Sequence, residues 1–167
     1  SFASLKFPQW LLSHPAAVSA EQAIEHALQC ERAALDFDAR ITNSDGASFT
    51  TNESYNVYGN SEGFLAGYPT TRYSASCVVI GQDQGNMQRD YDYTVSRELH
   101  ALETMQSIGI KAATKTIARL GARKIKTCNA PVLYIPKLAT SLWSTLVGAI
   151  SGGNIYRKSS FLLDCID

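Results

Sequence analysis

The chain has 167 residues, enough for one ordinary domain and part of another. Its composition is globular, with 45% hydrophobic and 18% charged residues, and 15 basic residues balance 15 acidic ones. A net charge of zero argues against nucleic-acid binding, which normally relies on a basic excess. No apolar run approaches the roughly 18 residues of a membrane span, so we expect no membrane association.

The first predicted element is a helix that follows an extended lead-in. Residues 1–18 show no hydrophobic period, and we interpret them as this lead-in. Ser19 and Gln22 have the spacing of a capping box, in which each residue satisfies a backbone amide of the other. Apolar residues then recur at helical spacing as far as Leu35. The sequence therefore predicts an amphipathic helix from Ser19 to about Asp36.

The second predicted element is a β-sheet, because the hydrophobic period changes to two between residues 40 and 96. Turn-forming residues at 44–46, 59–63, 69 and 84–86 separate short alternating runs. We expect an antiparallel meander of four or five strands, with the doubly apolar run Cys77 to Ile80 at its centre. Six tyrosines fall in this region, and we expect them to form an aromatic core of the sheet: Tyr55, Tyr58, Tyr68, Tyr73, Tyr91 and Tyr93.

A second amphipathic helix is predicted from Leu102 to Leu120, with Gly121 as its left-handed stop. Together with the first helix and the sheet it completes a central α+β domain, which we assign to residues 19–126. The predicted fold class is therefore an antiparallel meander sheet with two flanking helices.

Residues 127–167 indicate the truncated beginning of a C-terminal domain. Two prolines bracket a predicted strand at 132–135, and a predicted helix from about Lys137 to Ile150 is stopped by the glycine pair 152–153. This strand and helix have no predicted partners in the chain. We expect the exposed apolar face of the helix to drive self-association, through Leu138, Leu142 and Leu146.

The cysteines give no sign of a metal or redox site. The chain has four cysteines, Cys30, Cys77, Cys128 and Cys165, and their spacing matches no zinc-binding or dithiol motif. Cys30 and Cys77 stand in apolar surroundings, which is typical of small buried side chains. We therefore expect reduced thiols in a cytoplasmic protein.

No complete catalytic set is visible either. The three histidines, His14, His26 and His100, are too far apart for the His-Glu-x-x-His motif of a metalloprotease helix. Ser151 follows a predicted helix, whereas a nucleophilic serine elbow follows a strand. Asp90 and Asp92 share one strand face, as paired catalytic carboxylates do, but we expect that face to be the solvated one. The residues predict no metal ligand and no catalytic residue in this chain.

Five segments nevertheless resemble a single family, the TldD/PmbA (TldD/TldE) metallopeptidases. They are residues 40–48 (RITNSDGAS), 59–64 (GNSEGF), 87–93 (MQRDYDY), 118–124 (ARLGARK) and 148–162, which contains GAISGG and YRKSSFL. The last segment resembles the PmbA (TldE) branch in particular. The resemblance runs from about Ser19 to the end of the chain and identifies it as an internal fragment of that branch.

The resemblance implies a function as well as a fold. The family consists of paired subunits of a cytoplasmic metallopeptidase, linked to maturation of microcin-like peptides and to breakdown of an antitoxin. The TldD subunit carries a His-Glu-x-x-x-His zinc motif, which would fall here at Leu146, Val147 and Ser151. Leucine and valine cannot bind zinc, and a lone serine hydroxyl is a poor ligand. The resemblance thus implies a non-catalytic subunit, with zinc expected in a TldD-like partner.

One polar segment is the candidate contact site of this chain. Tyr156, Arg157 and Lys158 follow the glycine pair and lie between two apolar runs. They could line a substrate chamber or hold a carboxylate of a peptide or partner, and a plain solvated loop is the competing interpretation. Two other functions stay open at this point: an interaction module without a proteolytic role, and a stand-alone non-metal hydrolase using Ser151 or the pair Asp90 and Asp92.

Overall fold

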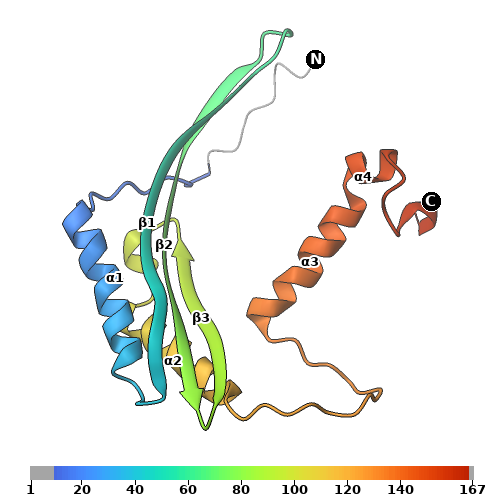
Figure 1. The fold of residues 1–167 in the computed structure, drawn as a ribbon. Coiled ribbons are helices and arrows are strands. Elements are labelled where there is room, and N and C mark those ends of the chain that lie inside the picture. The colour runs from blue at the N-terminus through green and yellow to red at the C-terminus, as the bar shows by residue number, and fades with distance from the viewer. Residues whose placement is uncertain (1–9, 166–167) are drawn as a thin grey trace. The chain divides into compact units, whose positions relative to one another are not determined.

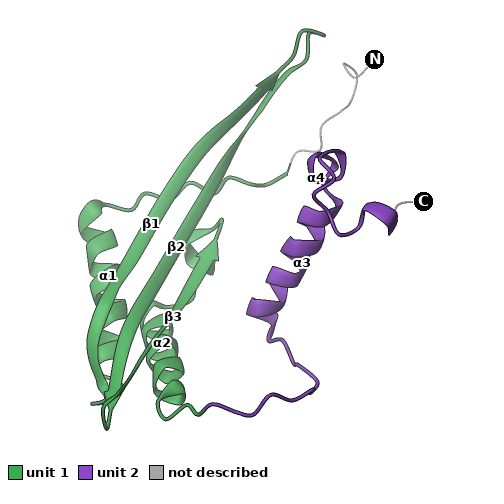
Figure 2. Cartoon of the chain, turned by 45° about the vertical axis from the view of Figure 1, so that its right-hand side comes forward, with its two compact units in different colours: residues 1–123 green, residues 124–167 purple. Residues whose placement is uncertain are grey.

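A computed structural model of the chain describes residues 10–165 (Figure 1). Residues 1–9, the first half of the predicted lead-in, lie outside the described residues. The chain divides into two units, residues 1–123 and residues 124–167, which Figure 2 colours separately. Each unit is described by itself below.

The sheet of the first unit has three strands, where four or five were predicted. They are β1 (Ile41–Gly59), β2 (Leu65–Asp83) and β3 (Asn86–Ser96), antiparallel in the order β1-β2-β3. The predicted turn at 44–46 is a bulge inside β1, where the register shifts and Gly46 has φ +112°. Pro69 lies within β2, opposite Tyr55 and beyond the end of β3, so its missing amide interrupts no bond to a third strand.

The two helices of this unit follow the predicted start and stop signals. Helix α1 (Ala20–Leu35) begins with the expected capping box: the Ser19 amide donates to Gln22 Oε1 at 2.9 Å, and the Gln22 amide donates to Ser19 Oγ at 3.2 Å. Helix α2 (Met105–Arg119) starts three residues later than predicted, because Thr104 is its N-cap and its hydroxyl accepts from the Ser107 amide at 3.2 Å. Residues 99–101 form a separate 3-10 turn before it. Gly121 adopts φ +74° after α2, as expected for a helix stop.

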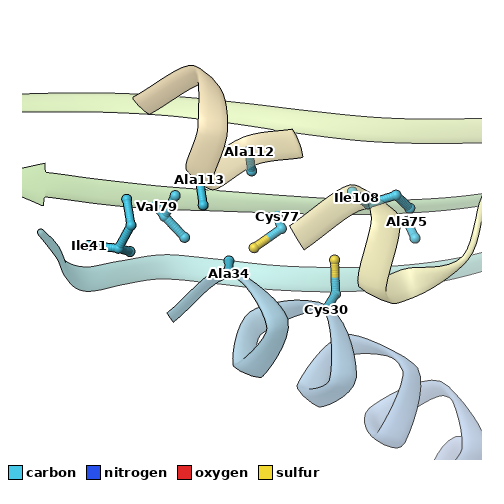
Figure 3. Packing of buried hydrophobic residues seen from close by; sticks show 9 residues of the cluster. All are labelled: Cys30, Ala34, Ile41, Ala75, Cys77, Val79, Ile108, Ala112 and Ala113. Atoms are coloured by element: carbon cyan, nitrogen blue, oxygen red, sulfur yellow. The ribbon is translucent and has the colours of Figure 1, made fainter. Parts of the chain in front are cut away.

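Both helices pack on one face of the sheet, which confirms the predicted α+β class. Nine residues form the core: Cys30, Ala34, Ile41, Ala75, Cys77, Val79, Ile108, Ala112 and Ala113 (Figure 3). Most of these side chains are small, so the elements approach closely. A Cβ on Gly109 would lie 2.2 Å from the backbone oxygen of Cys30, which means that α2 touches the backbone of α1 there.

The predicted aromatic core of the sheet is wrong. Of the six sheet tyrosines, Tyr73 is fully buried, whereas Tyr55, Tyr58, Tyr68, Tyr91 and Tyr93 are exposed. The helices cover the face that carries small residues such as Ala75 and Cys77. Tyr91 and Tyr93 alternate with the helix-facing residues of β3, so they point away from the core, and their rings stack at 6.2 Å.

The described part of the lead-in is an extended segment bound to the edge of β2. The amide of Thr71 donates to the carbonyl of Leu12 at 3.0 Å, and the amide of His14 donates to Thr71 Oγ1 at 2.9 Å. The Tyr73 hydroxyl donates to the His14 carbonyl at 2.9 Å and accepts from the amide of Ala16 at 2.8 Å. These bonds lie where β3 ends, because its last residue pairs with Tyr73.

The second unit consists of helix α3 (Pro136–Ile150), helix α4 (Gly152–Tyr156) and a 3-10 turn at Leu163–Cys165. The predicted strand at 132–135 is wrong: these residues have no regular structure, and no strand within residues 10–165 pairs with them. Pro136 opens α3 instead of closing a strand. Within residues 10–165, no helix has both the length and the apolar content that a membrane crossing requires.

Candidate functional site

The candidate site is built around a break between α3 and α4. Ser151 ends α3, where its amide donates to the carbonyl of Gly148 at 3.3 Å. Its own carbonyl then accepts from the amides of Asn154 and Ile155, both at 3.0 Å, so the same residue begins α4. The glycine pair 152–153, predicted as a helix stop, forms the first turn of this short helix.

The three predicted contact residues form the end of α4 and the turn after it. Tyr156 is the last residue of the helix and is 89% exposed. The Arg157 guanidinium Nε donates to the carbonyl of Gly153 at 3.1 Å, which holds the charged group against the turn. Lys158 adopts φ +54° and reverses the chain, and both of these cations are exposed. The site therefore presents two positive charges and one phenol to solvent on a hydrogen-bonded turn.

The positions where the resemblance would place a zinc motif do not have side chains that fit a metal. Leu146 and Val147 lie in the last turn of α3 and are 39% and 61% exposed, and Ser151 occupies the helix break. Two hydrocarbon side chains and one neutral hydroxyl offer zinc neither a charge nor a good donor atom. Among the described residues, no group of three histidine, cysteine or acidic side chains could hold a metal ion.

The two carboxylates that could have formed a catalytic pair face α2, and the predicted solvated position is wrong. Asp92 is 3% exposed and lies 3.2 Å from Lys115 Nζ, while Asp90 lies 3.1 Å from Arg119 Nη1. The strand alternation that puts Tyr91 outside puts both carboxylates under the helix. Each carboxylate is paired with a cation of α2, so the pair anchors the helix to β3.

The histidines do not converge on one centre. His14 and His100 lie on either side of Glu98, with nitrogen–oxygen distances of 3.5 Å and 2.9 Å. His26 packs its ring against Phe49 of β1, with ring centroids 4.8 Å apart. His14 and His100 thus share Glu98, while His26 lies apart from them against β1. None of the three histidines lies on α3 or α4, where the resemblance would place the zinc motif.

The buried thiols behave as core side chains, as predicted. Cys30 of α1 and Cys77 of β2 are both buried in the core between the helices and the sheet (Figure 3). The pKa of the Cys30 thiol is raised above its ordinary value, first because it shares a hydrogen bond with Cys77 and then because burial penalises the thiolate. A protonated, fully buried thiol is a poor nucleophile and a poor metal ligand.

Sequence reasoning missed one exposed apolar surface, on the outer part of the β1–β2 hairpin. Tyr55, Val57 and Leu65 are 68%, 63% and 75% exposed there. Their alternation with polar neighbours was visible in the sequence, but alternation identifies a face without saying whether anything covers it.

A comparison with protein families decides the family. The model of the PmbA/TldA metallopeptidase central domain matches residues 13–120. The chain belongs to this metallopeptidase family. It is 48% identical over 159 residues to Metalloprotease PmbA of Escherichia coli O157:H7 and 46% identical over 157 residues to its homolog in Haemophilus influenzae. These matches cover 95% and 94% of the chain but 35% of each relative, so the chain spans about a third of their length.

Solved structures support the same fold. A Thermotoga maritima protein, named as a proposed modulator of a DNA gyrase, superposes with a TM-score of 0.87 at 18% identity. A Bacteroides thetaiotaomicron protein with a similar name superposes with a TM-score of 0.82 at 25% identity. They match 96% and 98% of this chain, which covers 37% and 38% of theirs.

Proposed function

We propose that this chain is part of the non-catalytic subunit of a two-subunit cytoplasmic metallopeptidase, whose zinc is held by a TldD-like partner chain. The observation that carries the proposal is the chemistry at the end of α3. Where the family's zinc motif would stand, the chain has Leu146, Val147 and Ser151. None of these side chains can act as a general base, and together they cannot hold the metal that activates water.

The substrates in this proposal are unstructured peptides, including microcin-like precursors that the complex matures. The subunit would contribute walls of the substrate chamber and a surface for the partner. Arg157 is suited to hold a peptide or partner carboxylate, because its guanidinium is exposed and is oriented by its bond to Gly153. Tyr156, exposed on the preceding helix, offers a ring for apolar contact and a hydroxyl for hydrogen bonding.

A stand-alone hydrolase is less well supported by the geometry. Asp92 is buried and paired with Lys115, and Asp90 is paired with Arg119, so neither carboxylate faces a space where a peptide could react. Ser151 is exposed at a helix break and has no histidine on α3 or α4 to accept its proton.

The test uses the protein at the full length that its gene encodes, alone and mixed with the TldD-like chain of the same organism. We expect cleavage of an unstructured peptide by the mixture, loss of that cleavage with a chelator, and no cleavage by this protein alone. Elemental analysis of the protein alone should find no stoichiometric zinc. Chelator-resistant cleavage by this protein alone would refute the proposed function.

The role of Arg157 is tested in the same mixture with Arg157→Ala. We expect a five- to tenfold rise in KM for peptides with a free carboxylate, because one charge-assisted hydrogen bond is lost. Arg32→Ala is the matched control, since Arg32 is an exposed arginine on α1 with one weak ion pair to Glu25 at 3.8 Å. Equal KM values for the two variants would remove the role of Arg157 and leave the two-subunit proposal standing.

A further inference from the structure

The β1–β2 hairpin continues well beyond the third strand. The last residue of β3, Ser96, pairs with Tyr73, whereas β1 and β2 stay paired from Asn52–Arg72 out to Gly59–Leu65. We call residues 52–72 the arm. Figure 1 shows the arm projecting past both helices and past β3. At about 3.4 Å per residue, its paired part is roughly 27 Å long.

One face of the arm is apolar and continues the face that the helices cover elsewhere. In β2, alternate residues run from Leu65 and Pro69 on the arm to Ala75 and Cys77 in the core. Beside them in β1 stand Tyr55 and Val57, paired with Pro69 and Gly67. Ala75 and Cys77 are buried under α1 and α2, and Thr71 at the root of the arm is also buried. Farther out on the same face, the helices do not reach the arm, and the exposed residues there are Tyr55, Val57, Leu65 and Pro69.

The opposite face of the arm also carries exposed aromatic rings. Tyr58 and Tyr68 are 64% and 52% exposed, and the Tyr58 ring contacts the ring of Phe64 at the tip with centroids 5.9 Å apart. Charges are confined to the tip and the root of the arm, at Glu53, Glu62 and Arg72. A surface with apolar groups on both sides and so few charges fits a protein partner and is unsuited to a nucleic acid or a charged membrane.

The size of the arm limits what its partner can be. One face of a two-stranded ribbon this long covers roughly 300 Å², while a stable interface buries about 800 Å² on each partner. Two copies stacked arm on arm would therefore bury too little for a stable dimer. A partner that encloses both faces and the tip comes close to the required area. A free two-stranded ribbon is also marginally stable in water, so enclosure would stabilise the arm itself.

We infer that the arm inserts into an apolar cleft of the zinc-bearing partner subunit, an inference that rests on the two-subunit function proposed above. Binding by insertion would make the arm the main attachment of the two subunits. The apolar side chains at its middle, above all Val57 and Leu65, would then carry most of the affinity, because they lie at the centre of the enclosed surface.

The test measures binding of the full-length protein to the TldD-like chain of its organism by sedimentation velocity. Val57→Glu should weaken binding at least tenfold, since it places a charge in an apolar cleft. The matched control is Met87→Glu, which changes a residue of similar exposure, 66% against 63%, on the other hairpin of the same sheet. Met87→Glu should leave binding unchanged. A photocrosslinking residue at position 57 should join this chain to the partner.

Four outcomes would overturn the inference. Unchanged binding by Val57→Glu would show that the arm is not the attachment. A crosslink from position 57 to another residue of the same chain would place the arm against its own chain. In that case Val57→Glu should also lower the melting temperature of this protein measured without the partner. A crosslink between two copies would make it a self-association surface. If the unmodified protein does not bind the partner at all, the proposed function fails together with this inference.

Discussion

Helices α2 and α3 have the same length, 15 residues, and opposite surroundings. Helix α2 buries five residues against α1 and the sheet, and these are small or branched: Ile108, Gly109, Ala112, Ala113 and Thr116. Helix α3 carries larger apolar side chains, yet within the described residues Ala149 is its one buried residue. Burial is therefore decided by a partner surface of matching shape, and apolar content alone does not provide it.

The largest expected effect comes from adding one methyl group to α2. Gly109→Ala should lower the free energy of unfolding of residues 10–123 by about 3 kcal/mol, because overpacking against backbone forces α1 and α2 apart. The new Cβ would lie 2.2 Å from the carbonyl oxygen of Cys30. Urea unfolding followed by circular dichroism measures the loss. A change below about 0.5 kcal/mol would show that the helices are not in backbone contact.

The second prediction separates the two acidic residues under α2. Each carboxylate also accepts the amide of the next residue, at 2.7 Å for Asp92 and 2.8 Å for Asp90, so the difference lies in burial. Asp92→Ala should cost about 2 kcal/mol, because Asp92 is 3% exposed and its loss leaves Lys115 without its buried partner. Asp90→Ala should cost less than about 1 kcal/mol, since its partner Arg119 is exposed. Both values come from the same urea unfolding experiment. Equal losses would mean that burial of Asp92 adds nothing to its ion pair.

These contrasts also explain which parts of the fold could be predicted from the sequence. The start of α1 follows from local chemistry, because the capping box of Ser19 and Gln22 is complete within one turn. The number of strands could not be predicted from local chemistry. Ser44–Gly46 has the composition of a turn, but Gly46 is equally suited to the bulge that it forms inside β1. The strand predicted at 132–135 needed a neighbouring strand, which sequence propensity cannot supply.

The faces of the sheet were the least predictable feature. Alternation places Tyr91 and Asp92 on opposite sides of β3, but it does not say which side the helices cover. Hydrophobicity favours Tyr91 for the core, whereas the close approach of α2 to the sheet favours small residues and a carboxylate matched to Lys115. At the candidate site, the exposed polar character of Arg157 was predictable. Helix α4 was not, because a glycine pair normally signals a helix stop.

The third prediction makes the same glycine-to-alanine change in α3 that Gly109→Ala makes in α2. Gly148→Ala should raise the helix stability by about 0.5–1 kcal/mol, because alanine has the higher helix propensity. A Cβ at this position meets no atom within 4 Å among the described residues. Hydrogen exchange of the α3 amides measures the gain. A loss of protection of the α3 amides in the full-length protein would show that a neighbouring surface fills this space, as α1 does beside Gly109 of α2.

The smallest expected effect is electrostatic and lies between α1 and β1. The Arg40 side chain and amide, which donate to Asp38, lower the pKa of that carboxyl from 3.8 to about 2. Because the folded pKa lies below the unfolded one, the pair stabilises the fold above about pH 4 and loses this contribution as pH falls toward 2. Asp38→Asn should therefore slightly flatten the dependence of the urea midpoint on pH between 4.5 and 2.5. An unchanged profile would mean that the exposed pair is fully screened.

The arrangement of the four cysteines divides them into two kinetic classes. Cys128 and Cys165 are exposed, whereas Cys30 and Cys77 are sealed between α1 and β2. A thiol-specific dye should therefore label the first pair at once and the second pair only when α1 lifts from the sheet. If Cys128 and Cys165 are replaced by serine, the rate at which the dye labels Cys30 and Cys77 measures how often this interface opens. Cys30 and Cys77 can therefore report local opening of the contact between the first helix and the central strand of the sheet, without any added probe site.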